Sequence, residues 1–276
     1  MYNFKFNVNT AAANFEQELD LLLAIKSTLP RYLNSMPNEE FAYVAKLLSI
    51  KCNELKQRDE KPILVETGCG ASTIPLVYYA NKFSGNAYTW DINVLKISEL
   101  RRVLNETIGL IYKTNINDSW VAVQHFSTSR TLGINIMKEF NKKIDLFLHD
   151  SEHTNSNLIN ELNFAIECRN NSMYVLIDDA HYKFKNYDYA YANIMREKIG
   201  LSSVAIPENE LGKTLSESAE NFFKSKNIKY DFLMDFLKDN VLNDKLAGQD
   251  NLDLTSYLSG NLKTKIRFAA FKIYDN

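Results

Sequence analysis

The stretch Val65-Glu66-Thr67-Gly68-Cys69-Gly70-Ala71-Ser72-Thr73 decides the fold. It follows a short apolar segment, residues 62–65, and precedes a helix-like stretch, residues 74–82. A strand that ends at Gly-x-Gly and enters a helix leaves backbone N–H groups uncovered at its carboxyl end, and glycine lets a ligand approach them closely. We therefore expect a ligand-binding turn between a first strand and the helix that follows it.

The chemistry of this turn differs from that of a dinucleotide-binding loop. Glu66 places a carboxylate where it would repel a pyrophosphate, and Thr73 stands where the dinucleotide pattern has its third glycine. A carboxylate here suits a cationic or hydroxyl-rich ligand. The next predicted strand, residues 86–91, ends in Asp91, which lies 21 positions after Gly70. This distance is close to the spacing of about 20 residues in a βαβ unit.

Together, these residues resemble the first motifs of class I S-adenosylmethionine-dependent methyltransferases. In that family the loop wraps the methionine and ribose parts of the cofactor, and a second acid holds the ribose hydroxyls. The resemblance implies a doubly wound, mostly parallel, seven-stranded Rossmann-like α/β sheet. It implies S-adenosylmethionine as cofactor, with contacts from Glu66, Thr67, Gly68, Gly70, Ser72, Asp91, His125, Phe126 and Asp150. An unrelated tight turn or another nucleotide-binding fold is the alternative.

Within this set the resemblance gives three kinds of contact. It pairs Glu66 with the amine of the methionine part and Asp91 with the ribose hydroxyls. His125 and Phe126 fall where the family places residues beside the adenine ring, although ordinary core packing explains them equally well. Cys69 has no base near it in the sequence, so we expect a packed loop residue and not a nucleophile.

The composition limits the classes of function. The chain has 276 residues, of which 45% are hydrophobic, and a net charge of -2, which fits one α/β domain with an appended segment. Such a charge argues against sequence-independent binding of nucleic acid, and no segment approaches the roughly 20 apolar residues of a membrane span. The three cysteines have no paired spacing, which argues against disulfides and zinc. We expect a cytoplasmic protein that binds neither nucleic acid nor membrane; a homo-oligomer stays open.

Strands and helices alternate from residue 61 onward. The predicted strands are 62–67, 86–91, 120–126, 144–149 and 173–177, and the predicted helices lie near 93–107, 130–141 and 155–168. This order implies a parallel sheet whose ligands bind at the carboxyl ends of the strands. Residues 265–274 alternate like a final strand, which matches the closing antiparallel strand of the family.

Two regions differ from this βαβ rhythm. Apolar stripes within residues 13–58 predict helices, so residues 1–60 are interpreted as a helical lid, or as a layer that covers one face of the sheet. The methyltransferase domain then spans residues 61–276. Within it, residues 206–262 are polar and helix-like and are interpreted as an insertion.

Acids and histidines gather after the fourth and fifth predicted strands. The fourth strand runs into Asp150 and His153, and the fifth runs into Asp178, Asp179 and His181. Adjacent parallel strands lie about 4.8 Å apart, so carboxylates from both strand ends can reach one point. Gathered carboxylates repel one another unless a cation lies among them, and an oxygen-rich site suits magnesium, calcium or manganese.

This arrangement resembles metal-dependent O-methyltransferases such as catechol O-methyltransferase. By position, the resemblance implies Asp150, Asp178 and Asp179 as ligands of Mg²⁺ or another divalent cation. It implies His153 as the general base and His181 as a competing base or an outer-shell residue. The alternative is that the two consecutive aspartates simply cap the turn after the fifth strand.

The loop after the fourth strand is also similar to the methyltransferase-24 type of domain. Members of that type commonly read Asp-Gly-Asp-His, whereas this chain reads Asp150-Ser151-Glu152-His153. Serine replaces the glycine and glutamate replaces the second aspartate. These two departures leave open whether the loop turns in the same way.

These features predict an S-adenosylmethionine-dependent methyltransferase that acts on a hydroxyl group of a small-molecule acceptor with the help of a divalent metal. Methyl transfer from a sulfonium is an in-line displacement, so the acceptor oxygen must be held close and be nearly anionic. A bound metal lowers the pKa of that oxygen, and a histidine takes the remaining proton. Two alternatives stay open: a metal-independent methyltransferase with another acceptor, and a non-catalytic cofactor-binding protein of a secondary-metabolite pathway.

Overall fold

The computed structural model describes residues 14–181, 193–194, 196–198, 200–203, 212–241 and 267–274. Its strands form a seven-stranded sheet in the order β3-β2-β1-β4-β5-β7-β6. Strand β2 pairs in parallel with β1 and β3, and β4 pairs in parallel with β5, whereas β7 pairs antiparallel with β5 and with β6. The predicted class, a mostly parallel α/β sheet closed by an antiparallel strand, is confirmed. By its internal contacts the chain divides into two compact units, residues 1–125 with 235–264 and residues 126–234 with 265–276.

The sheet of the first unit consists of β1 (Ile63–Thr67), β2 (Asn86–Trp90) and β3 (Trp120–Val123). Its register places Glu66 beside Thr89 and Thr67 beside Trp90. Parallel strands are buried on both faces, so their sequences are nearly continuous apolar runs. The apolar segment 62–65 predicted β1 for this reason. The polar exceptions, Glu66 and Thr89, are completely buried as well, and they belong to the candidate site described below.

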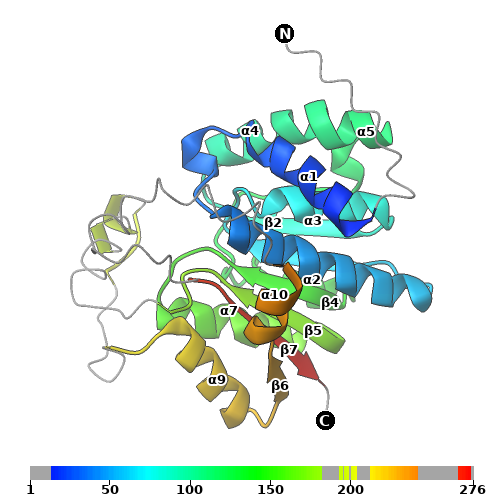
Figure 1. Cartoon of the computed structure of the whole chain (residues 1–276). Coiled ribbons are helices and arrows are strands. Elements are labelled where there is room, and N and C mark those ends of the chain that lie inside the picture. Colours follow the sequence, from blue (N-terminus) through cyan, green and yellow to red (C-terminus); the bar gives the residue numbers. More distant parts are fainter. Residues whose placement is uncertain are drawn as a thin grey trace, which may run out of the picture. The chain divides into compact units, whose positions relative to one another are not determined.

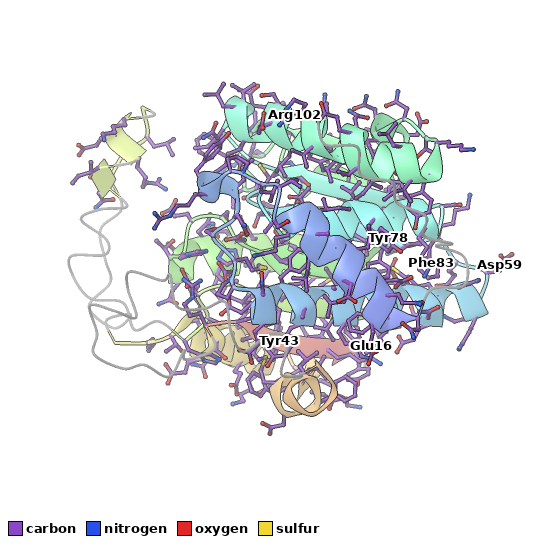
Figure 2. All side chains as sticks on the ribbon, turned by 45° about the horizontal axis from the view of Figure 1, so that its top comes forward. Glu16, Tyr43, Asp59, Tyr78, Phe83 and Arg102 are labelled. Atoms are coloured by element: carbon purple, nitrogen blue, oxygen red, sulfur yellow. The ribbon has the colours of Figure 1, made fainter. Side chains whose placement is uncertain are left out.

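Helices follow and flank these strands. Their bounds are α1 (Phe15–Lys26), η1 (Arg31–Leu33), α2 (Asn38–Gln57), α3 (Thr73–Lys82), α4 (Val94–Leu104), a π-helical turn η2 (Asn105–Gly109), α5 (Leu110–Tyr112) and η3 (Ile116–Asp118). Helix α3 contacts β1, β2, α1 and α2, so the predicted N-terminal helices pack over it. In Figure 2, Tyr78 of α3 lies among other side chains, whereas Arg102 lies on α4, where it pairs with Glu99 and Glu106.

Local sequence explains where the N-terminal helices begin. Asn14 caps α1 by accepting a hydrogen bond from the Gln17 N–H, and the Gln17 side chain accepts one from the Asn14 N–H. This reciprocal arrangement is a capping box. Helix α1 is then fixed to α3 by the buried carboxylate of Glu18, which accepts hydrogen bonds from Tyr79 and Lys82.

The sheet of the second unit consists of β4 (Ile144–His149), β5 (Arg169–Ile177), β6 (Lys229–Phe232) and β7 (Ala269–Tyr274). Its helices are α6 (Ile136–Glu139), α7 (Asn155–Glu167) and α9 (Leu215–Ser225), and α7 contacts both β4 and α9. Helix α10 (Met234–Val241) begins at the boundary of the two units. Figure 1 shows α9 beside β6 in this part of the chain.

The structure differs from the sequence-based prediction at three elements. Strand β5 begins four residues earlier than predicted, and α6 covers only four residues of the predicted 130–141 helix. The region predicted as a helical insertion, 206–262, contains helices in its described part but also β6, which joins the sheet through β7. Strand β6 has only four residues, too few for an alternating pattern to stand out in the sequence, and its side chains are mostly exposed, as is common at a sheet edge. The predicted domain boundaries stay a prediction.

Two general features complete the fold. Cys52, Cys69 and Cys168 are buried thiols that form no disulfide within the described residues. None of the helices in the described part of the chain combines the length and the apolar character that a membrane crossing requires.

Candidate functional site

The turn after β1 has the geometry of a close backbone approach. Gly68 has a positive φ of 80°, a conformation that favours glycine, and its N–H donates to the Trp90 carbonyl over 2.7 Å. A Cβ on Gly70 would lie 3.3 Å from the Leu33 carbonyl oxygen, which is tighter than an ordinary contact. The φ of Gly68 favours glycine, and a side chain at Gly70 would displace the Leu33 carbonyl by a few tenths of an ångström.

Glu66 supports this turn from the inside. Its side chain is 0% exposed. Its carboxylate accepts hydrogen bonds from the hydroxyls of Thr73 at 2.6 Å, Thr89 at 2.8 Å and Ser72 at 2.9 Å. The carboxylate is buried in this conformation, and its predicted contact with the amine of a cofactor stays a prediction. The structure gives Glu66 another task, which is to tie the start of α3 to β2.

Asp91 lies at the end of β2 and remains accessible. One of its carboxylate oxygens accepts from the Cys69 N–H over 2.9 Å, and the other accepts from the Asn93 N–H over 2.7 Å. A carboxylate has about four lone-pair sites, so capacity for further donors remains. The next residue, Ile92, is apolar and 44% exposed, and it is a candidate contact that sequence reasoning missed.

The remaining predicted cofactor residues differ in accessibility. Thr67 and Ser72 are buried, whereas His125 and Phe126, which follow β3, are partly exposed. Cys69 is buried, and burial together with the charge of Asp91 raises the pKa of its thiol. A thiol in this state is a packed loop residue and not a nucleophile.

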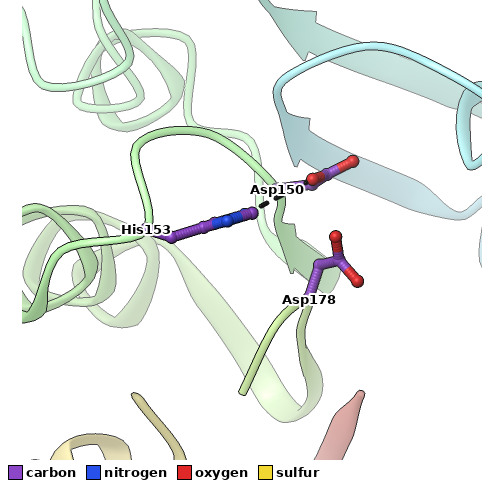
Figure 3. A group of neighbouring side chains, drawn as sticks. All are labelled: Asp150, His153 and Asp178. Carbon is purple, nitrogen blue, oxygen red and sulfur yellow. Dashed lines mark ion pairs between the residues drawn. The ribbon is translucent and has the colours of Figure 1, made fainter. Parts of the chain in front are cut away.

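A second group of polar side chains lies entirely in the second unit. The structure brings together Asp150, His153 and Asp178, whose ligand atoms lie within 4.8 Å of one another. Figure 3 shows the imidazole of His153 pointing at the carboxylate of Asp150, with Asp178 beside them. The His153 Nε2 atom is 3.5 Å from Asp150 Oδ1. Three atoms that bind one small divalent ion at about 2.1 Å lie about 3–4 Å from one another, so these side chains would have to move closer together to hold one.

Asp179, the third predicted ligand, is engaged elsewhere. Its φ of 49° turns the chain sharply after β5. One of its oxygens lies 3.0 Å from Arg267 Nη1, and the other lies 3.2 Å from His153 Nδ1. Burial alone would raise the pKa of Asp179, but His153 and Arg267 outweigh it and lower that pKa. The ligand set that the structure supports therefore contains His153 in place of Asp179.

His153 is held between two carboxylates. Burial lowers its pKa, but the hydrogen bonds to Asp150 and Asp179 and the nearby charge of Asp178 raise the pKa well above the ordinary value of 6.5. The geometry places His153 between the carboxylates of Asp150 and Asp179, and its role as general base stays a prediction.

The other two histidines near this edge have different surroundings. His181 is exposed and follows the Asp178–Ala180 turn. Tyr182 and Tyr187, which follow it, lie outside the described residues. His149 is completely buried at the end of β4, where its Nδ1 lies 2.6 Å from the carboxylate of Glu161.

Sequence reasoning missed several partners of these residues. Arg267 lies far along the chain from Asp179, and a lone arginine before a strand carries no signal that could reveal the ion pair. Glu161 follows His153 by eight positions and looks like an ordinary polar residue on the outer face of α7. Its burial could have been noticed from Leu158 and Leu162, which place neighbouring positions of α7 on its apolar face.

Comparisons with known proteins identify similar structures but no close relative. No family model matches the chain, and no curated protein matches it. An O-methyltransferase from Bacillus cereus in complex with SAH is similar, with 10% identity, a TM-score of 0.48, and coverage of 93% of this chain and 90% of that one. An SAH-bound methyltransferase from Podospora anserina has 11% identity, a TM-score of 0.48, and coverage of 94% and 87%.

A third solved structure is the magnesium protoporphyrin IX methyltransferase from Synechocystis PCC 6803 with bound SAH. It has 8% identity, a TM-score of 0.44, and coverage of 94% of each chain. All three are methyltransferases with SAH bound. Similarities this distant carry no argument about function, so the function must be argued from the residues of this chain.

Proposed function

We propose that this protein is an S-adenosylmethionine-dependent methyltransferase that acts on a hydroxyl group of a small molecule. The observation that carries the proposal is the turn after β1, where Gly68 adopts a positive φ and Asp91 fixes the Cys69 N–H. Such a turn presents backbone atoms and one accessible carboxylate at the carboxyl end of adjacent parallel strands, which is where open α/β sheets bind ligands. It presents no basic side chain for a pyrophosphate.

The accessible groups of this turn fit the parts of the cofactor. The spare lone pairs of Asp91 suit the two ribose hydroxyls, and the exposed Ile92 offers an apolar surface for the flat face of the adenine ring. Gly68 allows the methionine part to approach the backbone. Glu66 acts indirectly in this proposal, because its three hydroxyl partners hold the loop and the start of α3 in place.

The cluster in the second unit fits a divalent cation. Asp150, His153 and Asp178 would hold it, and two carboxylates with one imidazole suit manganese or iron better than magnesium, which prefers oxygen ligands alone. Asp179 would accept the other ring N–H of His153, as metal-bound histidines usually require, and Arg267 keeps Asp179 charged and oriented. The cation, when bound, lowers the pKa of an acceptor hydroxyl and so reduces the need for a strong base.

The proposed reaction is an in-line displacement. The acceptor oxygen forms a bond to the methyl carbon, the carbon–sulfur bond breaks, and its electron pair stays on sulfur. The hydroxyl proton is released to water as the acceptor oxygen becomes a nucleophile, so the products are the methylated acceptor, S-adenosylhomocysteine and a proton. The protein contributes by holding the acceptor oxygen close to the methyl group, which supplies much of the rate enhancement in such reactions.

Calorimetry with S-adenosylmethionine tests the cofactor proposal. We expect binding by the natural chain and its loss in Gly68→Val, because a branched side chain is strained at this φ and would stand where the ligand meets the backbone. Gly212→Val is the matched control, since Gly212 also has a φ of 80° but has open space around its Cβ position. Equal cofactor binding by Gly68→Val and the natural chain would contradict the proposed site.

Methyl transfer to a panel of hydroxylated small molecules, with and without a chelator, tests the remainder of the proposal. Turnover that stops with chelator and returns with Mn²⁺ supports the metal-assisted reaction. Turnover that persists in chelator favours the metal-independent alternative. Cofactor binding without turnover on any acceptor favours a non-catalytic cofactor-binding protein.

A further inference from the structure

A second buried acid–histidine pair lies behind the cation cluster. Glu161 of α7 and His149 at the end of β4 both have side chains that are 0% exposed, and His149 Nδ1 lies 2.6 Å from Glu161 Oε2. The other oxygen of the carboxylate accepts hydrogen bonds from Ser127, from Ser151 at 2.7 Å and from Asn157 at 3.2 Å. Four donors from four segments of the second unit therefore converge on one carboxylate.

The charge on Glu161 fixes which nitrogen of His149 carries a hydrogen. Burial raises the pKa of Glu161, but the adjacent His149 and the hydrogen bonds from His149, Ser127 and Ser151 outweigh burial and lower that pKa. An ionised carboxylate only accepts hydrogen bonds, so Nδ1 of His149 must be the donor. The Nε2 atom is buried and has no hydrogen-bond partner within the described residues.

This arrangement is costly for stability alone. A buried ion pair or charged hydrogen bond often contributes no more than well-packed apolar residues of the same volume, and a buried polar atom without a partner costs about 1–3 kcal/mol. Leucine or phenylalanine at these positions would avoid both costs. A buried polar pair that is retained although apolar residues would be more stable points to a functional role for the pair.

The neighbours of the pair indicate what that role is. Ser151 and Asn157 connect Glu161 to the loop that carries Asp150 and His153, since Asn157 also donates to Ser151 Oγ at 2.9 Å and to the Glu152 carbonyl at 3.2 Å. The imidazole rings of His149 and His153 lie 5.9 Å apart, centre to centre. Glu161 therefore holds both ends of the loop on which two members of the cation cluster stand.

We propose that Glu161 and His149 are positioning residues for the cation site, Glu161 by fixing the 150–154 loop and the Nδ1–H form of His149, and His149 by supporting the ring of His153. This inference rests on the proposed cation site. It assigns no ligand role to either residue. Its consequence is that cation affinity depends on a carboxylate that does not touch the cation.

The test is Mn²⁺ binding to the full chain, measured by calorimetry, for the natural protein and for Glu161→Gln. Glutamine keeps an oxygen that can accept from Ser151 and Ser127, but its amide N–H groups face the donor at His149 Nδ1. We expect nitrogen NMR to show that the hydrogen of His149 moves to Nε2, and we expect Mn²⁺ affinity to fall about 10–100-fold, the usual effect of removing an outer partner of a metal site. S-adenosylmethionine affinity should not change.

Glu167→Gln is the matched control, because Glu167 lies on the same helix with an exposed side chain paired to Lys138. It should bind Mn²⁺ like the natural chain. If Glu161→Gln fails to fold, Ser151→Ala takes its place, and we expect a several-fold loss from the missing hydroxyl. If the variant that folds binds Mn²⁺ as tightly as the natural chain does, the inference is overturned. Absence of Mn²⁺ binding by the natural chain would instead overturn the cation site itself, and the inference with it.

Discussion

Glu66 in the first unit and Asp150 and Asp178 in the second all belong to the ends of parallel strands, yet their surroundings differ completely. Glu66 is buried and accepts hydrogen bonds from three hydroxyls. Asp150 is partly exposed and Asp178 is only just buried, and both lie close to His153 and to each other. A carboxylate in the first setting is fully used by the fold, whereas those in the second setting retain charge that a ligand can satisfy.

The difference teaches how to separate structural acids from binding acids. Hydroxyl donors that come from the same loop and the neighbouring strand satisfy an acid without any external partner, as Ser72, Thr73 and Thr89 do for Glu66. Carboxylates that converge at one point repel one another, and a cation or a protonated histidine among them relieves that repulsion. The contrast predicts opposite responses to mutation in the two regions.

The largest expected effect on stability is that of Glu66→Ala. Three buried hydroxyls would lose their acceptor, and each buried polar group without a partner costs about 1–3 kcal/mol. We expect the free energy of unfolding to fall by at least about 3 kcal/mol, as measured by urea denaturation. Glu16→Ala on the N-terminal part of α1 is the control for an acid without such a network. A stability loss below 1 kcal/mol would mean that the two regions do not differ as described.

Asp178→Asn should show the reverse pattern. Removal of one charge from the cluster relieves repulsion with Asp150, so the free energy of unfolding should stay within about 1 kcal/mol of the natural value or rise. Mn²⁺ affinity should fall more than about 100-fold, because a direct ligand matters more than the outer partners of a metal site. Turnover should collapse while S-adenosylmethionine affinity stays the same. Unchanged Mn²⁺ affinity would remove Asp178 from the site.

Asp91 is the accessible acid of the first unit, and we expect the stability effect of Asp91→Ala to lie between those of Glu66→Ala and Asp178→Asn. Loss of hydrogen bonds to a charged group should cost about 1.5–3 kcal/mol of cofactor affinity, measured by calorimetry. The backbone N–H groups of Cys69 and Asn93 would be left to solvent, so a small loss of stability should accompany the change. Asp118→Ala, at an exposed position of η3, is the control. Full cofactor affinity in Asp91→Ala would place the ribose elsewhere.

The smallest expected effect is a dependence of stability on pH that comes from Glu161. Its pKa is lower in the folded protein than its ordinary value of 4.5. The stabilisation that this shift provides is therefore present above that ordinary value and is lost as pH falls through the lower pKa of the folded protein. The stability difference between the natural chain and Glu161→Gln should narrow between pH 5 and pH 3 in thermal unfolding experiments. A constant difference would show that Glu161 is protonated in the fold.

The sequence by itself determined the βαβ order, the glycine turn and its two acids, and the gathering of acids and histidines after β4 and β5. These are local signals: an apolar run that stops at Gly-x-Gly, or an acid that follows a buried strand, depends only on neighbouring residues. The same holds for β4 and α7, which were predicted over 144–149 and 155–168 and span Ile144–His149 and Asn155–Glu167. Strand β6 was not predicted from the sequence, because a four-residue, mostly exposed edge strand carries too weak an apolar pattern.

The tertiary structure alone decided what each acid does. Glu66 and Asp91 look equivalent in the sequence, but only the fold brings Thr89 of the next strand onto the Glu66 carboxylate and leaves Asp91 accessible. Asp178 and Asp179 are neighbours in the chain, yet the positive φ of Asp179 sends its carboxylate to Arg267 and leaves Asp178 with His153. The physical reason is that a carboxylate's role depends on which donors surround it, and those donors come from segments that only folding brings together.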